Sequence, residues 1–118
     1  MTQDEMRAII LSFPGVEEGT SYGRPAFKVK GKFFTRLRAE DDSLVLMEVG
    51  PDEREMLMEA DTETFFLHPH YRNHDLVLVR AGRIDPDWAR PRLIRDWRAA
   101  APKRWLKEWD AAHPLSSV

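Results

Sequence analysis

The hydrophobic positions of the first fifty residues change from a helical spacing to a strand spacing. Thr2 followed by Glu5 forms a capping box, which predicts a helix through about Ser12. Its apolar face comprises Met6, Ile9, Ile10 and Phe13. Pro14-Gly15 ends this helix, and strands with turn residues between them follow. The strands are predicted at residues 18–22, 26–29, 33–37 and 44–49, with breaks at Gly23-Arg24-Pro25 and at residues 39–42.

The middle of the chain predicts a second helix and an inner strand. Gly50-Pro51 starts the helix, with proline at its first position and acidic side chains in its first turn. The apolar side of this helix comprises Met56, Leu57 and Ala60. The continuous apolar run from Leu76 to Val79 predicts an inner strand that is covered on both faces.

The last third of the chain is predicted to be helical. Asp85-Pro86 caps a helix that carries Leu93, Ile94, Trp97 and Ala101 at helical spacing. Pro91 is expected to kink this helix or to mark where its regular part begins. Pro102 ends it, and a short helix follows over residues 103–110. All four tryptophans have spacings that favour a role in the core. The elements predict one α+β domain on an antiparallel sheet over residues 1–112, with a frayed tail at 113–118.

Composition excludes several classes of protein. The content of 42% hydrophobic and 32% charged residues is typical of a folded domain, not of a disordered chain. No apolar run approaches the ~18 residues of a membrane span, and the acidic start "MTQDEMR" is unlike a signal peptide, so we expect a cytoplasmic location. The absence of cysteine excludes disulfides, a thiol nucleophile and cysteine metal sites.

Charge is segregated along the chain, although its sum is only −2. Residues 20–39 contain six basic side chains and no acidic one, whereas residues 40–66 contain ten acidic side chains opposed by Arg54 alone. From Leu67 onward, ten basic residues outnumber six acidic ones. This segregation points to charged surfaces on a protein that is not basic overall.

The pentapeptide Gly19-Thr20-Ser21-Tyr22-Gly23 matches the G-x-S-x-G pattern of serine hydrolases. That chemistry requires a strand, a strained turn and then a helix within a large α/β sheet. Here a strand pattern follows the serine, and Pro25 disfavours helical geometry at Arg24. We therefore interpret Gly19 and Gly23 as turn residues that flank a short strand.

Histidines suggest a second kind of chemistry. His68, His70, His74 and Asp75 could supply three nitrogens and one oxygen to zinc or another transition metal. The segment is a loop interrupted by proline with Arg72 among the candidate ligands, so we favour solvated histidines and no metal.

The hairpin around Lys30-Gly31-Lys32 has two possible registers. A two-residue loop pairs Val29 with Lys32 and mixes charged and apolar side chains on each face. A three-residue loop with Gly31 in the left-handed conformation pairs Val29 with Phe33 and Phe27 with Thr35. The second register separates the faces, and we therefore predict it.

In that register one face is apolar and the other is basic. Phe27, Val29, Phe33, Thr35 and Leu37 would point inward, and the outward face would comprise Lys28, Phe34, Arg36 and Arg38. Cations around an aromatic ring suit phosphate contacts and base stacking, although an ordinary solvated strand face is the alternative. A smaller basic patch of Lys103, Arg104 and Lys107 lies beside Trp105 and has the pattern of a solvated helix face.

The ordered motifs resemble those of the MmcQ/YjbR-like family. "LSFPGVEEGTSYGRPAFKVKGKFFTRL" is similar to its N-terminal signature, and "FFLHPHYRNHDLVLVR" and "APKR" follow in the expected order. The resemblance implies an α+β fold of the order α-β3-α-β2-α, also described as secretion-chaperone-like, with helices packed on an antiparallel sheet. It further implies DNA binding through paired β-wings, and it provides no catalytic residues.

Together these observations favour a small, monomeric, non-enzymatic binding protein of the cytoplasm, with no cofactor and no membrane contact. Nucleic acid is the expected ligand. The expected contacts are Lys28, Lys30, Lys32, Phe34, Arg36 and Arg38, with Arg72 and Arg80 as neighbours. A protein-interaction or adaptor domain that does not bind nucleic acid is the alternative. A third hypothesis is a small anion in a pocket near His68, His70, Tyr71 and Arg72.

Overall fold

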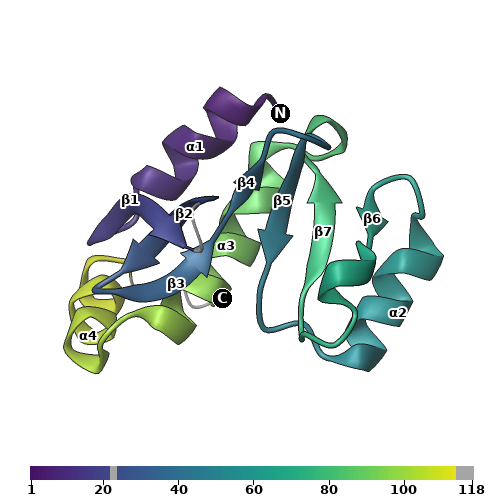
Figure 1. Ribbon diagram of the computed structural model, residues 1–118. Helices are drawn as coiled ribbons and strands as arrows, with labels where there is room; N and C mark the ends of the chain where they lie inside the picture. The colour runs from purple at the N-terminus through teal and green to yellow at the C-terminus, as the bar shows by residue number, and fades with distance from the viewer. Residues whose placement is uncertain (22–23, 114–118) are drawn as a thin grey trace.

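Two antiparallel sheets lie against a layer of helices that covers one of their faces (Figure 1). A computed structural model describes residues 1–21 and 24–113, apart from the side chains of Ser21 and Arg24. The predictions that concern Tyr22, Gly23 and the tail beyond His113 lie outside the described residues. Within the described ranges, no helix combines the length and the apolar character that a membrane crossing requires.

The first sheet has three strands and the second has four, counted over the described residues. The strands of the first sheet, in spatial order, are β1 (Val16–Ser21), β2 (Arg24–Val29) and β3 (Lys32–Thr35). Those of the second sheet, in spatial order, are β4 (Leu37–Arg38), β5 (Ser43–Leu46), β7 (Val77–Arg80) and β6 (Phe65–Phe66). All neighbouring strands are antiparallel.

The chain passes from one sheet to the other at Arg36, where a single strand over residues 33–37 was predicted. β3 pairs with β2, whereas β4 pairs with β5, so the strand changes partner between Thr35 and Leu37. The junction is held by the Val45 amide, which donates to the Arg36 carbonyl at 3.0 Å, and by the Thr35 hydroxyl, which donates to the Val45 carbonyl at 2.7 Å. The prediction of one continuous strand is therefore wrong.

The helices begin where their capping residues predict. α1 (Gln3–Leu11) has the Thr2–Glu5 capping box, and α3 (Pro86–Ala100) is capped by the Asp85 carboxylate, which accepts from the Trp88 amide at 3.0 Å. The other helices are α2 (Pro51–Ala60), α4 (Lys103–Ala112) and the short 3-10 helices η1 (Pro69–Tyr71) and η2 (Ala81–Arg83). α3 already begins at Pro86, so Pro91 does not mark the start of its regular part.

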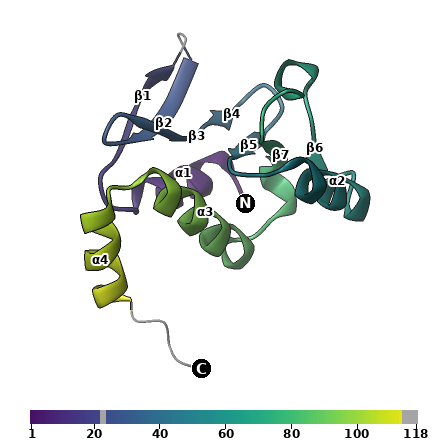
Figure 2. The same ribbon diagram turned by 90° about the horizontal axis from the view of Figure 1, so that it is seen from below.

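The main core lies between the sheets and the layer formed by α1 and α3 (Figure 2). Trp97 is completely buried there, and its indole N–H donates to the Pro14 carbonyl at 2.9 Å. A smaller cluster on the opposite face of the four-stranded sheet contains Val45, Tyr71, Leu76 and Leu78. β7 contributes to both clusters, which confirms the inner strand that the apolar run predicted.

Two predictions about apolar faces are wrong. Met56 of α2 is 60% exposed, and Leu57 and Met58 are the side chains of that helix that pack against the core. Trp88 is 37% exposed, with its ring beside Phe65. Both residues follow a helical spacing. Met56, however, lies on an exposed face of α2, and Trp88 lies in the first turn of α3, where it is only partly covered.

The α+β class is confirmed, with differences in the order of strands. Over the described residues, five strands precede α2, two strands lie between α2 and α3, and α4 follows α3. The strand count implied by the family resemblance is not confirmed. The arrangement places α2 and α4 at opposite ends of the molecule and leaves one broad face of the sheets without a helical layer over β3, β4 and β5 (Figure 2).

Candidate functional site

The serine pattern does not occupy the setting of a hydrolase nucleophile. Ser21 is the last residue of β1, and the next element is the antiparallel strand β2, not a helix. Gly19 lies within β1 opposite Ala26, so its predicted role as a turn residue is wrong. Gly23 lies outside the described residues.

The tip of the basic hairpin is a two-residue turn. Val29 pairs with Lys32, and both Lys30 (φ 49°) and Gly31 (φ 81°) have left-handed backbone conformations, as a type I′ turn requires. The left-handed conformation of Gly31 is therefore confirmed, but the three-residue loop and the pairing of Val29 with Phe33 are wrong.

A bulge below the tip changes the register and rearranges the faces. Lys28 lies opposite Phe33, which continues the register of the two-residue turn. The next pair is Phe27 with Thr35, which is the pair that the register of the three-residue loop predicted. The extra residue on β3 is Phe34, which turns into the core and is only 1% exposed. Phe33 is left half-buried on the outer side, where the Arg36 guanidinium lies 5.9 Å from the centre of its ring.

Two of the predicted contact residues are therefore inaccessible. Phe34 packs edge-on against Phe13, and Arg38 is only 6% exposed. Asp41 holds Arg38 in an ion pair of 3.0 Å, and Arg38 also donates to the Tyr71 hydroxyl at 3.2 Å. An outward face containing Phe34 and Arg38 is thus wrong, because the bulge and an internal counter-ion draw both side chains inward.

The charges of Arg38 and Asp41 stabilise one another in this pair. Burial acts to lower the pKa of Arg38, but the hydrogen bond and negative charge of Asp41 more than offset it, so the pKa lies above its ordinary value. Burial likewise acts to raise the pKa of Asp41, but hydrogen bonds from Arg38 and Ser43 hold that pKa below its ordinary value. Both side chains therefore remain charged, and Arg38 is paired within the protein instead of being presented to a ligand.

The remaining predicted contacts come from different parts of the fold. Lys30 and Lys32 are exposed at the hairpin tip, while Lys28 is half-buried and lies opposite Glu17 in the strand pairing. Arg80 and Arg72 belong to the four-stranded part of the molecule. The Arg80 guanidinium lies 4.2 Å from the centre of the Phe66 ring, and Arg72 is exposed just after η1.

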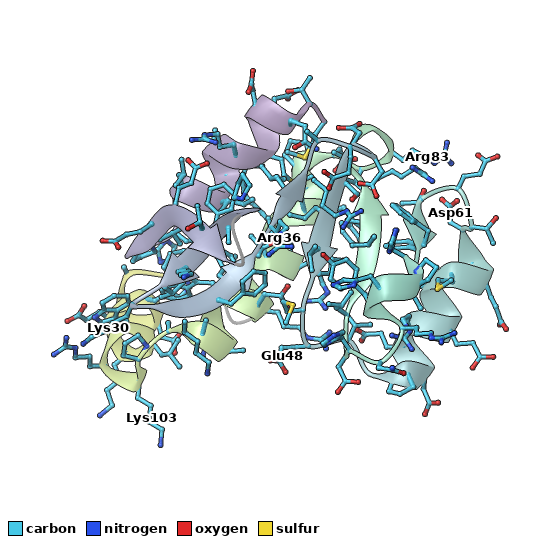
Figure 3. All side chains as sticks on the ribbon, in the orientation of Figure 1. Lys30, Arg36, Glu48, Asp61, Arg83 and Lys103 are labelled. Carbon is cyan, nitrogen blue, oxygen red and sulfur yellow. The ribbon has the colours of Figure 1, made fainter. Side chains whose placement is uncertain are left out.

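The fold instead brings the hairpin tip to the helix that carries the second basic patch. The Lys32 ammonium group donates to the Ala99 carbonyl at 3.3 Å, close to the start of α4. Lys30 and Lys103 lie at the same end of the molecule (Figure 3). We call this region the basic end, and it comprises the exposed side chains of Lys30, Lys32, Lys103, Arg104 and Lys107.

The start of α4 favours anions at the basic end. Pro102 is its N-cap, no side chain caps the first amides, and the first turn contains no acidic residue. Free amides at a helix N-terminus attract negative charge. The sequence showed both basic segments, but the adjacency of segments some seventy residues apart depends on tertiary structure.

The histidine segment does not assemble a metal site. His68 accepts a hydrogen bond from the His70 amide at 3.1 Å, which orients its ring along the backbone of η1. In the part of the chain that the structure describes, no three histidine or carboxylate side chains are grouped as metal ligands. The candidate set of His68, His70, His74 and Asp75 is therefore not brought together.

Part of the histidine segment lines a concavity of about 460 Å³ between the two sheets and η1. Arg36, His70, Tyr71 and His74 contribute its polar groups. Of the four residues expected around a small anion, His70 and Tyr71 lie here, whereas His68 and Arg72 are not among the lining residues. Arg36, which the strand pattern placed on a nucleic-acid surface, belongs to this concavity.

Comparison with known proteins identifies the family. The chain matches the family model described as YjbR over residues 11–99, which includes both sheets, α2 and most of α3. No curated protein and no solved structure matches the chain. Because the match extends over most of its length, the chain belongs to the YjbR family.

Proposed function

We propose that this protein is a small, non-enzymatic protein of the cytoplasm that binds nucleic acid as a monomer through its basic end. The observation that carries the proposal is the meeting of two basic segments, the hairpin tip and the start of α4, at one end of the fold. The DNA binding implied by the family resemblance agrees with this proposal.

The chemistry of the basic end suits phosphate groups more than base edges. Its exposed lysine and arginine side chains supply donors, and the uncapped amides of α4 add a favourable dipole. Phe34, the ring that was expected to stack on bases, is buried and is not available for that contact. Binding should therefore be weakly dependent on sequence and strongly dependent on salt.

Fluorescence anisotropy with short duplex DNA, single-stranded DNA and RNA tests the proposal. If all five cations contact phosphates, the logarithm of the binding constant should fall with the logarithm of salt concentration with a slope of about −4.5 for duplex DNA and about −3.5 for single strands. The double variant Lys30→Glu/Lys103→Glu should weaken binding at least about tenfold, because each reversal replaces an attraction by a repulsion.

A matched variant separates the effect of a local binding surface from the effect of net charge on affinity. Arg72→Glu/Arg90→Glu changes the net charge by the same amount at two exposed positions outside the basic end, so it should retain most of the affinity. Equal losses in the two variants would contradict a specific surface. Absence of binding by the unmodified protein at low salt would reject nucleic-acid binding and favour an adaptor that meets a protein partner.

A further inference from the structure

The concavity over the junction of the sheets has the size and lining of a small-molecule site. Its volume of about 460 Å³ lies within the range of roughly 300–1,000 Å³ that is typical of ligand pockets. Phe33, Val45, Met47 and Leu76 provide apolar walls, and the polar groups converge from the Arg36 junction and from η1 and its flanking residues.

Arg36 and Tyr71 place donors at one side of this concavity. The Arg36 guanidinium donates to the Tyr71 hydroxyl at 3.2 Å, and the buried Arg38 donates to the same oxygen at 3.2 Å. A hydroxyl that accepts two hydrogen bonds still has its own hydrogen to donate. The neighbouring guanidinium and phenol can therefore both direct donors at an acceptor on a bound molecule.

The electrostatics of the lining select an anion. No carboxylate is among the described residues that line the concavity, and the nearby Asp41 is engaged by Arg38 and Ser43. The Arg36 guanidinium brings a positive charge to the lining, and its side chain is half-buried, where water screens a charge less than at the surface. Guanidinium groups bind carboxylates through paired, charge-assisted hydrogen bonds.

The rest of the lining selects a flat apolar body. Phe33 and Tyr71 contribute aromatic rings from opposite elements, β3 and η1, and His70 lies edge-on to Tyr71 with their ring centres 5.0 Å apart. Met47 adds a flexible side chain that adapts to the shape of a ring system. We propose that this concavity binds a small aromatic carboxylate, with the carboxylate at Arg36 and Tyr71 and the ring against Phe33 and Met47.

Titration of ¹⁵N-labelled protein with 2-naphthoate tests the proposal. Amide signals of Phe33, Val45, Met47 and Tyr71 should shift saturably, with a dissociation constant on the order of 1 mM or lower for a probe of this size. The neutral 2-naphthamide and the cationic 2-naphthylmethylamine should bind at least about tenfold more weakly, because they lack the charge that Arg36 recognises.

Substitutions at Arg36 then separate charge recognition from shape. Arg36→Met should weaken 2-naphthoate at least about tenfold, Arg36→Lys should retain part of the affinity, and Arg72→Met should have no effect. If Arg36→Met does not fold, the comparison of the three probes on the unmodified protein still decides the outcome.

Three results would overturn the proposal. They are equal affinity for the three probes, unchanged binding by folded Arg36→Met, and shifts confined to the larger groove that Phe13, Trp105 and Trp109 line beside α4. The site is independent of nucleic-acid binding. Lys30→Glu/Lys103→Glu should bind 2-naphthoate normally, so failure of either proposal leaves the other intact.

Discussion

Gly15 is the residue at which the turn after α1 meets the ring of Trp105. Its φ is +71°, and a Cβ atom added there would lie 2.3 Å from a carbon of that ring. We expect Gly15→Ala to lower the free energy of unfolding by about 2–4 kcal/mol, because alanine disfavours left-handed backbone and the ring must move. Urea denaturation measures this loss, and amide hydrogens of α4 should exchange faster because Trp105 holds that helix in place.

Gly19→Ala is the matched control for this substitution. Gly19 lies in β1, and no other part of the described structure comes within 4 Å of a Cβ atom added there. The free energy of unfolding should therefore change by no more than about 0.5 kcal/mol. Similar losses in the two variants would mean that the contact between Gly15 and Trp105 is unimportant for stability.

At the scale of elements, the two-residue turn between β2 and β3 is strained at its first position. Lys30 has φ 49°, a conformation that asparagine tolerates better than other side chains with a Cβ atom. We expect Lys30→Asn to be more stable than Lys30→Ala by about 0.5–1 kcal/mol in urea denaturation. Both variants remove the same charge. A lower free energy of unfolding for Lys30→Asn than for Lys30→Ala would therefore contradict the type I′ turn.

Local signals in the sequence were sufficient to predict where α1, α2 and α3 begin. The Thr2–Glu5 box, the Gly50-Pro51 start and the Asp85-Pro86 cap each act through residues within four positions of one another. The inner strand β7 (Val77–Arg80) was also predictable to within one residue, because the uninterrupted apolar run at 76–79 is typical of a strand that is covered on both faces.

The candidate site was less predictable because its geometry depends on register. Phe33 and Phe34 are adjacent and chemically alike, so the pattern alone does not show which one enters the core. The Arg38–Asp41 pair, three positions apart, was a local signal that could have indicated burial of Arg38. The concavity at Arg36 depends on the passage of the chain from one sheet to the other, and no local sequence pattern predicts that passage.

At the scale of the whole molecule, Asp96 connects the helical layer to the end of β5. One carboxylate oxygen of Asp96 accepts from the Met47 amide at 3.0 Å, and the other pairs with Arg92 at 2.6 Å. Arg92 in turn donates to the Met47 carbonyl at 2.8 Å. Asp96 is 2% exposed, so α3 is joined to Met47 through a buried ionisable group that has lost its contact with water.

Burial of Asp96 makes its ionisation unfavourable for folding. Loss of solvation raises its pKa from 3.8 to about 6, although the charge and hydrogen bond of Arg92 act in the opposite direction. Between these two pH values the folded protein retains a proton that the unfolded chain has lost. Stability contributed by this group is therefore highest below about pH 4 and falls as the pH rises through 6.

Comparison of the native protein with Asp96→Asn across pH measures this linkage. As the pH rises from 4 to 7, the free energy of unfolding of the native protein should fall relative to that of Asp96→Asn, by on the order of 3 kcal/mol. Asp61 provides a control of opposite sign, because a hydrogen bond from Thr64 lowers its pKa below 3.8. Relative to Asp61→Asn, the native protein should gain stability as the pH rises through the range below about 4. A constant difference between the native protein and Asp96→Asn from pH 4 to 7 would show that the buried carboxylate does not govern stability in this range.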